Sequence, residues 1–201
     1  MKVLVTGNPR SGTLSMKNML RANGFDVEHE RCGADGTVSC FFFTPATWYP
    51  REKLTARRHM QANGKDEVFN WRDFETRIHL VRDPLKCIPS MRKVCGVGHQ
   101  KWIHDHLGVP VTRGKDWKLL WAMRAWYRTN SVCEKIPGIY RIRIERVQAD
   151  WPVTLGKAPQ VLHQHASTGT RKSSPVKWKD LVAVDADLAD RIADMAERYG
   201  Y

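Results

Sequence analysis

The chain has 201 residues, of which 33 are Lys or Arg and 21 are Asp or Glu, so its formal net charge is +12. Its hydrophobic fraction of 42% and charged fraction of 27% are ordinary for a globular protein and exclude a wholly disordered chain. At this length we expect one domain. The positive charge indicates an anionic partner, which can be a nucleic acid, a membrane surface or a small polyanion.

The five cysteines are widely spaced, odd in number and without a C-x-x-C pair. This pattern favours reduced thiols over a disulfide framework or a zinc site. The apolar run Val3–Val5 is too short for the core of a signal peptide, and no run of about 18 apolar residues is available to span a membrane. We therefore expect a cytoplasmic protein that has no membrane as a partner.

The first half of the chain alternates short apolar runs with an amphipathic segment. Val3–Val5 is β-branched and apolar and is ended by Gly7, which predicts a buried strand. From about Gly12, apolar residues recur on one helical face until Asn23 and Gly24, which are typical of a helix end. The next expected elements are a strand at 25–28, a buried segment of either type at 38–43, and a loop with helical pieces at 45–75.

The second half continues this alternation. The expected elements are a strand at 78–81, a helix at 85–95, a long helix at 115–133 and a strand at 139–144. A C-terminal helix is predicted by the one-sided spacing of Leu188, Ile192, Met195 and Tyr199. Strands that alternate with helices predict an α/β fold, which we expect to be a single-domain three-layer sandwich with a mostly parallel central sheet.

A glycine-bounded loop follows the first predicted strand. Gly7 and Gly12 have the spacing of a P-loop-like phosphate-binding loop, and the start of the following helix favours an anion. An NTPase would have Lys and then Ser or Thr after the second glycine. Here Thr13 and Leu14 follow, and the cation, Arg10, lies inside the loop. The loop therefore predicts a bound phosphate-type anion without the magnesium-nucleotide arrangement; the alternative is an ordinary turn before a helix.

A second candidate anion site follows the strand at 78–81. Arg82 stands at the C-terminal end of this strand, where parallel sheets bind their ligands. Ser90 is expected about two turns into the helix that follows Pro84. A guanidinium binds phosphate in a bidentate way, and a hydroxyl adds a further donor.

In this order the two motifs resemble those of the P-loop sulfotransferases, which transfer a sulfuryl group from 3′-phosphoadenylyl sulfate (PAPS) and release the 3′,5′-bisphosphate PAP. The chain is similar to small bacterial-type members, more weakly so at 27–30, 35–39, 143–145, 167–172 and 198–201. The resemblance implies PAPS as co-substrate, PAP as product and no required metal. It also implies a small-molecule or glycan-like acceptor that receives the group on a hydroxyl or an amine.

The resemblance also implies which residues hold PAPS. Its 5′-phosphosulfate would be bound by Pro9, Arg10, Ser11, Gly12, Thr13 and Leu14. Its 3′-phosphate would be bound by Arg82 and Ser90, together with Arg171 and Lys172 of a late basic loop. There are two departures from the family pattern. Arg10 stands where many members have lysine, and Leu14 replaces the second threonine of a Thr-Thr pair, whose contact Ser15 could supply.

Sulfuryl transfer builds negative charge on the leaving phosphate, which a cation in the loop is expected to stabilise. Arg10 is the candidate, and it would act by charge and hydrogen bonds because a guanidinium does not usefully donate its proton. Glu30 first, and His29 second, are candidates for the base that takes the acceptor's proton. Since successive strand residues point to opposite faces, we expect only one of the two to face the site. The alternative for either is a solvated or capping residue.

Two other functions remain open from the sequence. A P-loop nucleotide kinase or NTPase is favoured by the apolar run that ends in Asp83, a possible magnesium ligand, and opposed by the missing Gly-Lys-Ser/Thr. A basic nucleic-acid-binding module is suggested by the net charge, but the chain has no helix-turn-helix, zinc or RNP pattern. We therefore expect no nucleic acid as a partner. The histidines at 104–106 and 163–165 have no Cys or Glu at ligand spacing, so we expect no metal there.

Overall fold

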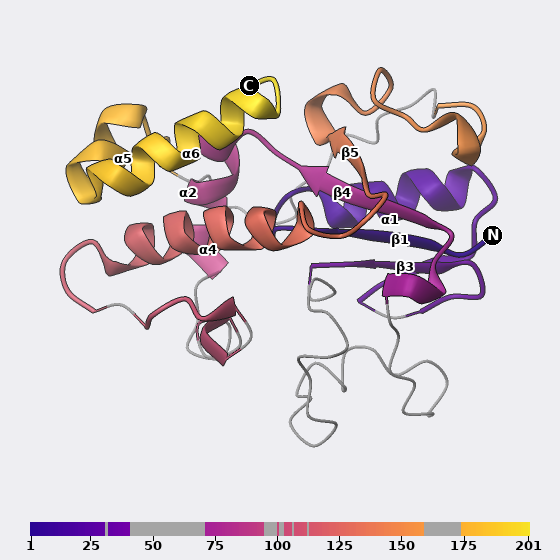
Figure 1. Cartoon of the computed structure of the whole chain (residues 1–201), viewed down its shortest axis with the longest axis horizontal. Helices are drawn as coiled ribbons and strands as arrows, with labels where there is room; N and C mark the ends of the chain where they lie inside the picture. The colour runs from indigo at the N-terminus through magenta and orange to yellow at the C-terminus, as the bar shows by residue number, and fades with distance from the viewer. Residues whose placement is uncertain are drawn as a thin grey trace. The chain divides into compact units, whose positions relative to one another are not determined.

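The computed structural model describes residues 1–30, 32–40, 71–94, 100, 103–105, 107–111, 113–158 and 174–201 (Figure 1). The chain divides into two compact units. The first comprises Met1–Val81 and Val132–Ala166, and the second comprises Arg82–Ser131 and Ser167–Tyr201. The single domain expected from the length of the chain stays a prediction.

In the described residues, the first unit contains a five-stranded sheet with the strand order β2-β3-β1-β4-β5. The strands are β1 (Val3–Gly7), β2 (Val27–His29), β3 (Gly36–Ser39), β4 (Thr76–Val81) and β5 (Tyr140–Arg143). All the pairings between these strands are parallel. The structure confirms the α/β class and the parallel sheet, and it is consistent with a three-layer sandwich.

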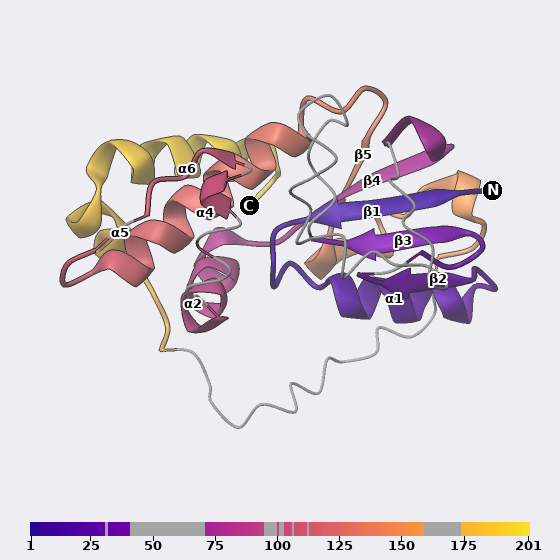
Figure 2. The same ribbon diagram turned by 90° about the horizontal axis from the view of Figure 1, so that it is seen from below.

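Helix α1 (Thr13–Ala22) lies along one face of this sheet (Figure 2). The core on this face contains Val3, Val5, Met16, Met19, Leu20, Ile78 and Leu80, together with other buried side chains. Leu4 points to the opposite face, as the strand alternation requires, and packs there against Phe74. Fully burying an aliphatic side chain of this kind contributes about 1.5–3 kcal/mol, so this core stabilises the packing of α1 on the sheet.

All the regular secondary structure in the described part of the second unit is helical. It includes α2 (Pro84–Val94), α4 (Trp117–Cys133, whose last two residues belong to the first unit), α5 (Trp178–Val184) and α6 (Ala186–Arg198). Trp126 of α4 is buried, and its ring centroid lies 6.2 Å from that of Tyr199. Asp185 caps α6 by accepting a hydrogen bond from the Leu188 N–H at 3.0 Å.

Most of the expected elements are present, with small shifts at their ends. The segment at 38–43, left open between helix and strand, is strand as far as Ser39, and residues 41–70 lie outside the described part. Short 3-10 helices occur at Trp71–Asp73, Ile144–Arg146 and Val153–Leu155. The sequence does not predict α5, because seven residues with Leu181 alone buried show no helical period. None of the described helices is both long and apolar enough to cross a membrane.

Candidate functional site

The segment from Gly7 to Gly12 turns the chain from β1 into α1, and both of its glycines are sterically required. A Cβ on Gly7 would lie 2.2 Å from the Leu80 carbonyl oxygen of neighbouring β4. A Cβ on Gly12 would lie 2.7 Å from Ile144 Cγ1. Gly12 also has a φ of 100°, in the left-handed region that costs other residues about 1–2 kcal/mol. The two glycines therefore let this loop pass close to β4 and to the segment after β5.

The start of α1 has backbone N–H groups that the helix does not use. The Met16 N–H donates to the Gly12 carbonyl at 3.0 Å, so the N–H groups of residues 13–15 precede the first full helical hydrogen bond. No described side chain caps this end, and the first turn contains no acidic residue. The helix dipole adds positive potential at the same point. This end of α1 is therefore suited to hold an anion.

Two residues inside the loop have features typical of a ligand-binding segment. Ser11 is fully buried, and its Oγ has no hydrogen-bond partner among the described residues. A buried hydroxyl left in this way costs about 1–3 kcal/mol, which a ligand in the loop would offset. Arg10 is exposed and has a φ of 70°. Such conformations in residues other than glycine cluster at functional sites.

The first residue of α1 contacts the last residue of β2. Thr13 Oγ1 lies 2.9 Å from His29 Nε2, with Thr13 buried and the His29 side chain 31% exposed. Burial lowers the pKa of His29; the Glu30 carboxylate raises it, the Lys17 ammonium lowers it, and the net shift is downward. His29 is therefore neutral at pH 7, and its ring can donate or accept at Nε2 according to its tautomer.

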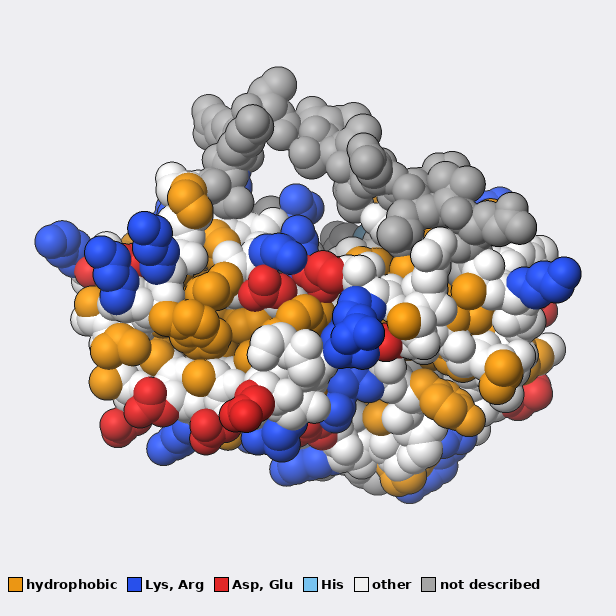
Figure 3. All heavy atoms as spheres, turned by 90° about the horizontal axis from the view of Figure 1, so that it is seen from above, with side chains coloured by type: hydrophobic (Ala, Val, Ile, Leu, Met, Phe, Trp, Pro, Cys, Tyr) orange, Lys and Arg blue, Asp and Glu red, His pale blue; other side chains and the backbone are white. Residues whose placement is uncertain are grey.

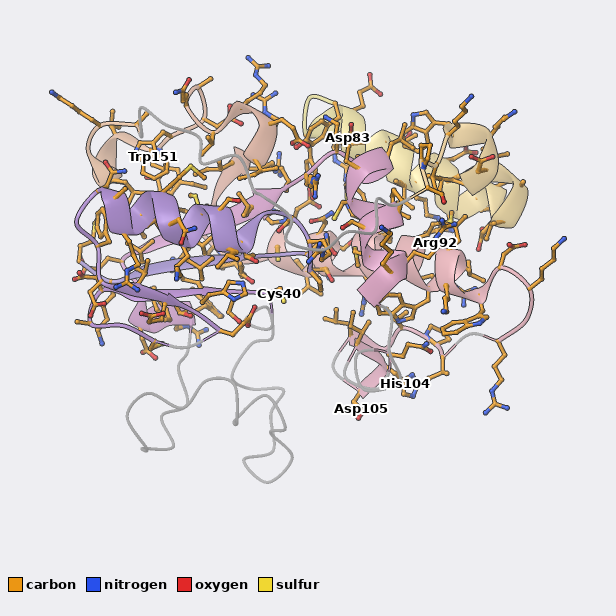
Figure 4. The ribbon with its side chains drawn as sticks, turned by 180° about the vertical axis from the view of Figure 1, so that it is seen from behind. Cys40, Asp83, Arg92, His104, Asp105 and Trp151 are labelled. Atoms are coloured by element: carbon orange, nitrogen blue, oxygen red, sulfur yellow. The ribbon has the colours of Figure 1, made fainter. Side chains whose placement is uncertain are left out.

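Glu30 follows β2 directly, and both of its carboxylate oxygens accept hydrogen bonds. Ser39 Oγ donates to Oε2 at 2.5 Å, and the Cys40 N–H and thiol donate to Oε1 at 3.1 and 3.2 Å. Cys40, labelled in Figure 4, follows the end of β3. Burial and the Glu30 charge raise the pKa of its thiol well above the ordinary value, so the thiol stays protonated and donates. Glu30 is therefore a fixed carboxylate.

His29 and Glu30 lie together, although strand alternation predicts that only one of them faces the site. Glu30 Oε1 is 3.6 Å from His29 Nε2. The physical reason is that β2 ends at His29 and Glu30 has a φ of 59°, so the alternation of an extended strand does not continue through it. Neither residue is merely solvated, because His29 contacts Thr13 and the Glu30 side chain is 15% exposed.

The predicted residues of the second motif are assigned to the second unit. Arg82 follows Val81, the last residue of β4, and Ser90 lies in the second turn of α2. Both are half-buried. Helix α2 begins at Pro84, as the sequence predicts.

Asp83, labelled in Figure 4, caps α2. Its Oδ1 accepts a hydrogen bond from the Leu85 N–H at 2.8 Å, and its Oδ2 lies 3.6 Å from Lys86 Nζ. The helix therefore already uses this carboxylate, which counts against the magnesium-binding role that the kinase alternative gives it.

Some predicted residues cannot be placed. Arg171 and Lys172 lie outside the described residues, as do His106 and residues 163–165. His104 lies in the described part, and its Nδ1 is 3.0 Å from the Val109 carbonyl oxygen. Among the described side chains, no three of the His, Cys, Asp and Glu type gather in a way that could hold a metal ion.

The sequence analysis does not identify three residues of the candidate site. Ser39 and Cys40 hold Glu30, and the charge of Lys17 acts on His29. A signal for the first two is present in principle, because the carboxyl ends of adjacent parallel strands meet at one sheet edge, where ligands bind. This signal can be used only when the pairing of β2 with β3 is known, and no local sequence pattern indicates that pairing.

Comparison with known proteins gives no match: no family model, curated protein or solved structure matches this chain.

Proposed function

We propose that this chain is a PAPS-dependent sulfotransferase that acts on a hydroxyl or amine of a small-molecule or glycan-like acceptor. The observation that carries the proposal is the loop from Gly7 to Gly12. It combines the uncapped start of α1, the buried Ser11 hydroxyl without a described partner, and the Arg10 guanidinium. These are the groups of a P-loop-like anion cradle. The resemblance of both motifs to P-loop sulfotransferases narrows the anion to PAPS.

In the proposed reaction the acceptor oxygen or nitrogen attacks the sulfur of PAPS. The bond from sulfur to the bridging oxygen of the 5′-phosphate breaks, and PAP leaves with its electron pair. Arg10 stabilises the charge that grows on this phosphate. Arg82 and Ser90, with Arg171 and Lys172, are the proposed partners of the 3′-phosphate. The reaction requires no metal as a partner of the nucleotide.

The acceptor's proton passes to Glu30 as first candidate, with His29 as second. A carboxylate has about four acceptor directions, and Glu30 Oε2 accepts the Ser39 hydrogen bond alone among the described donors, so it keeps a lone pair for the acceptor. The fixed orientation of Glu30 suits a base that must meet one proton in one place.

The proposed setting is cytoplasmic, without a membrane or a nucleic acid as partner. Cys32, Cys40, Cys87 and Cys133 are thiols, which suits a reducing compartment. On the face drawn in Figure 3, the described Lys and Arg side chains lie near Asp and Glu side chains. No nucleic acid is proposed as a partner because the sequence has no helix-turn-helix, zinc or RNP pattern.

Binding measurements separate the three candidate functions. PAP is expected to raise the melting temperature without magnesium, and Mg-ATP is not. A shift with Mg-ATP alone would favour the nucleotide kinase or NTPase. Steeply salt-dependent binding of an oligonucleotide, with no binding of PAP, would favour the nucleic-acid-binding module. Transfer of labelled sulfuryl groups from PAPS to a panel of alcohols, amines and glycans then tests turnover and identifies the acceptor.

A matched pair of arginine variants tests the loop itself. Arg10→Ala is expected to weaken PAP binding about ten- to a hundredfold, because it removes charge-assisted hydrogen bonds to a phosphate. Arg21→Ala is the control, since Arg21 lies in the last turn of α1 and pairs with Glu28. Equal affinities of the two variants for PAP would refute the assignment of Arg10.

A further inference from the structure

The side chains of Thr13 and Glu30 both lie close to the same ring nitrogen of His29, Nε2. His29 Nε2 lies 2.9 Å from Thr13 Oγ1 and 3.6 Å from Glu30 Oε1. A proton on Nε2 donates to the threonine hydroxyl, and the positive charge of a protonated ring lies close to the Glu30 carboxylate.

The direction of the Thr13–His29 hydrogen bond decides what the Thr13 hydroxyl can do. If the ring carries its proton on Nδ1 alone, the hydroxyl donates to Nε2 and has no proton left for a ligand. If Nε2 carries a proton, the ring donates to Oγ1, and the hydroxyl proton is available to another acceptor. A bound anion needs the second arrangement, because it accepts hydrogen bonds and donates none.

Among the described residues, the charges that act on His29 are those of Lys17 and Glu30. Lys17 of α1 disfavours the imidazolium, and the Glu30 carboxylate after β2 favours it. Cys40, after β3, is a protonated thiol directed at Glu30. Glu28 of β2 is paired with Arg21 at 2.8 Å. Burial keeps the ring neutral in the free protein. An anion in contact with the Thr13 hydroxyl would add negative charge within about 4–6 Å of the ring and favour its protonated form.

We propose that His29 is a positioning residue that takes up a proton when an anion binds at the start of α1, and that its Nε2–H then turns the Thr13 hydroxyl toward that anion. A proton from solvent forms the new N–H bond of the imidazolium, and no bond between heavy atoms changes. This inference rests on the proposed anion-binding function of the loop from Gly7 to Gly12. It also leaves the base role to Glu30, because a histidine that already carries the extra proton cannot accept one from the acceptor.

The decisive measurement is an NMR pH titration of the histidine rings with sodium sulfate as the probe. Sulfate stays a dianion throughout the pH range in which histidine titrates, so any proton taken up belongs to the protein. The reference is sodium chloride at equal ionic strength. Saturating sulfate is expected to raise the pKa of His29 by about one unit. By linkage, sulfate then binds about tenfold more tightly below both His29 pKa values than above them. The ring of His104, whose Nδ1 contacts the Val109 carbonyl oxygen at 3.0 Å, serves as the reference signal.

A matched pair of variants completes the test. His29→Gln, which also assigns the His29 signal, is expected to abolish the pH dependence of sulfate affinity, whereas His104→Gln is expected to keep it. If His29→Gln does not fold, as judged by circular dichroism, the titration of the unmodified protein decides. Sulfate binding with an unchanged His29 pKa overturns this inference and leaves the proposed function standing. Failure of both sulfate and PAP to bind overturns the inference and the proposed function together.

Discussion

The hydroxyl of Ser39 donates a 2.5 Å hydrogen bond to Oε2 of Glu30. The two residues meet because β2 and β3 run parallel and side by side, with His29 opposite Val38 in the register. Cys40 adds its N–H and its thiol as donors to the other carboxylate oxygen. The end of β3 therefore fixes the orientation of a carboxylate that belongs to the end of β2.

Replacing Ser39 tests how much this contact contributes. Ser39→Ala is expected to lower the free energy of unfolding by about 1.5–3 kcal/mol, because the lost hydrogen bond is to a charged carboxylate. Urea denaturation at pH 7 measures this loss in the free energy of unfolding. The control is Ser131→Ala, whose hydroxyl donates to the neutral Tyr127 carbonyl at 2.8 Å, and which is expected to cost about 1 kcal/mol or less. Equal losses in the two variants would show that Glu30 is not held through this bond.

Replacing the loop glycine Gly12 by alanine is expected to destabilise the protein far more than the same substitution at Gly24. Both have positive φ, 100° and 87°, so alanine at either costs about 1–2 kcal/mol in the backbone. A Cβ at Gly24 would meet no described atom within 4 Å, whereas one at Gly12 would lie 2.7 Å from Ile144 Cγ1. Gly12→Ala should therefore cost a further 1–3 kcal/mol or so from overpacking.

Thermal melts of the two glycine variants measure this difference. Adding Ile144→Ala to Gly12→Ala should make the effect of the glycine substitution smaller than it is in the unmodified background, because the clash disappears. Equal effects of Gly12→Ala in both backgrounds would show that the contact with Ile144 is not its cause.

Asp150 is expected to give acid-dependent stability. Arg143 donates to it from Nε and Nη2 at 2.7 Å each and from its backbone N–H at 2.9 Å. These side-chain bonds hold the pKa of Asp150 below its ordinary value despite partial burial. Because the folded state holds this proton less tightly than the unfolded state, the contribution is fully present above the unfolded pKa of about 4. It is lost as the pH falls through the folded pKa.

Asp150→Asn should therefore destabilise the protein by about 1.5–3 kcal/mol at pH 7, and the difference from the unmodified protein should shrink on acidification. Unfolding by urea at a series of pH values measures this. Glu28→Gln, which breaks the exposed pair with Arg21, should change stability by about 0.5 kcal/mol or less. A difference for Asp150→Asn that stays constant down to the lowest pH would contradict the role given to Arg143.

Arg82 and Ser90 are the proposed partners of the 3′-phosphate. Affinities for two ligands, one with and one without this phosphate, distinguish that role from a general effect on nucleotide binding. Arg82→Ala is expected to weaken PAP binding about ten- to a hundredfold. Its affinity for adenosine 5′-phosphosulfate, which lacks the 3′-phosphate, should stay the same. Ser90→Ala should act in the same direction with a smaller effect. Isothermal titration calorimetry measures the affinities of both variants, with Arg92→Ala, on the same helix as Ser90, as control (Figure 4). If Arg82→Ala lost the same affinity for PAP and for adenosine 5′-phosphosulfate, the assignment of Arg82 to the 3′-phosphate would be refuted.

Much of the fold follows from local patterns. Buried parallel strands are apolar on both faces, so Val3–Val5 stands out as a continuous apolar segment, and the run at 78–81 as one interrupted only by His79. Asn23 and Gly24 end α1 where the sequence predicts it. Helix α5 is missed because a short helix with one buried residue leaves no periodic signal.

The candidate site could be predicted residue by residue, but not as an arrangement. Thr13, His29 and Glu30 each stand out in the sequence, whereas their contacts depend on the left-handed backbone of Glu30 and on the pairing of β2 with β3. Ser39 is missed for the same reason. Strand pairing is a long-range property, and a single left-handed residue other than glycine leaves no pattern in the sequence.

The central position of β1 in the sheet also has a consequence for folding. Val3 pairs with Gly36 on one side and with Thr76 on the other, and Ile78 of β4 pairs with Tyr140. Long loops must close before β1 or β4 gains a partner, which makes folding slow compared with that of a helical bundle. Until then, the apolar residues of β1 are open to pairing with other chains, so refolding should compete with aggregation, and dilute protein should refold in higher yield.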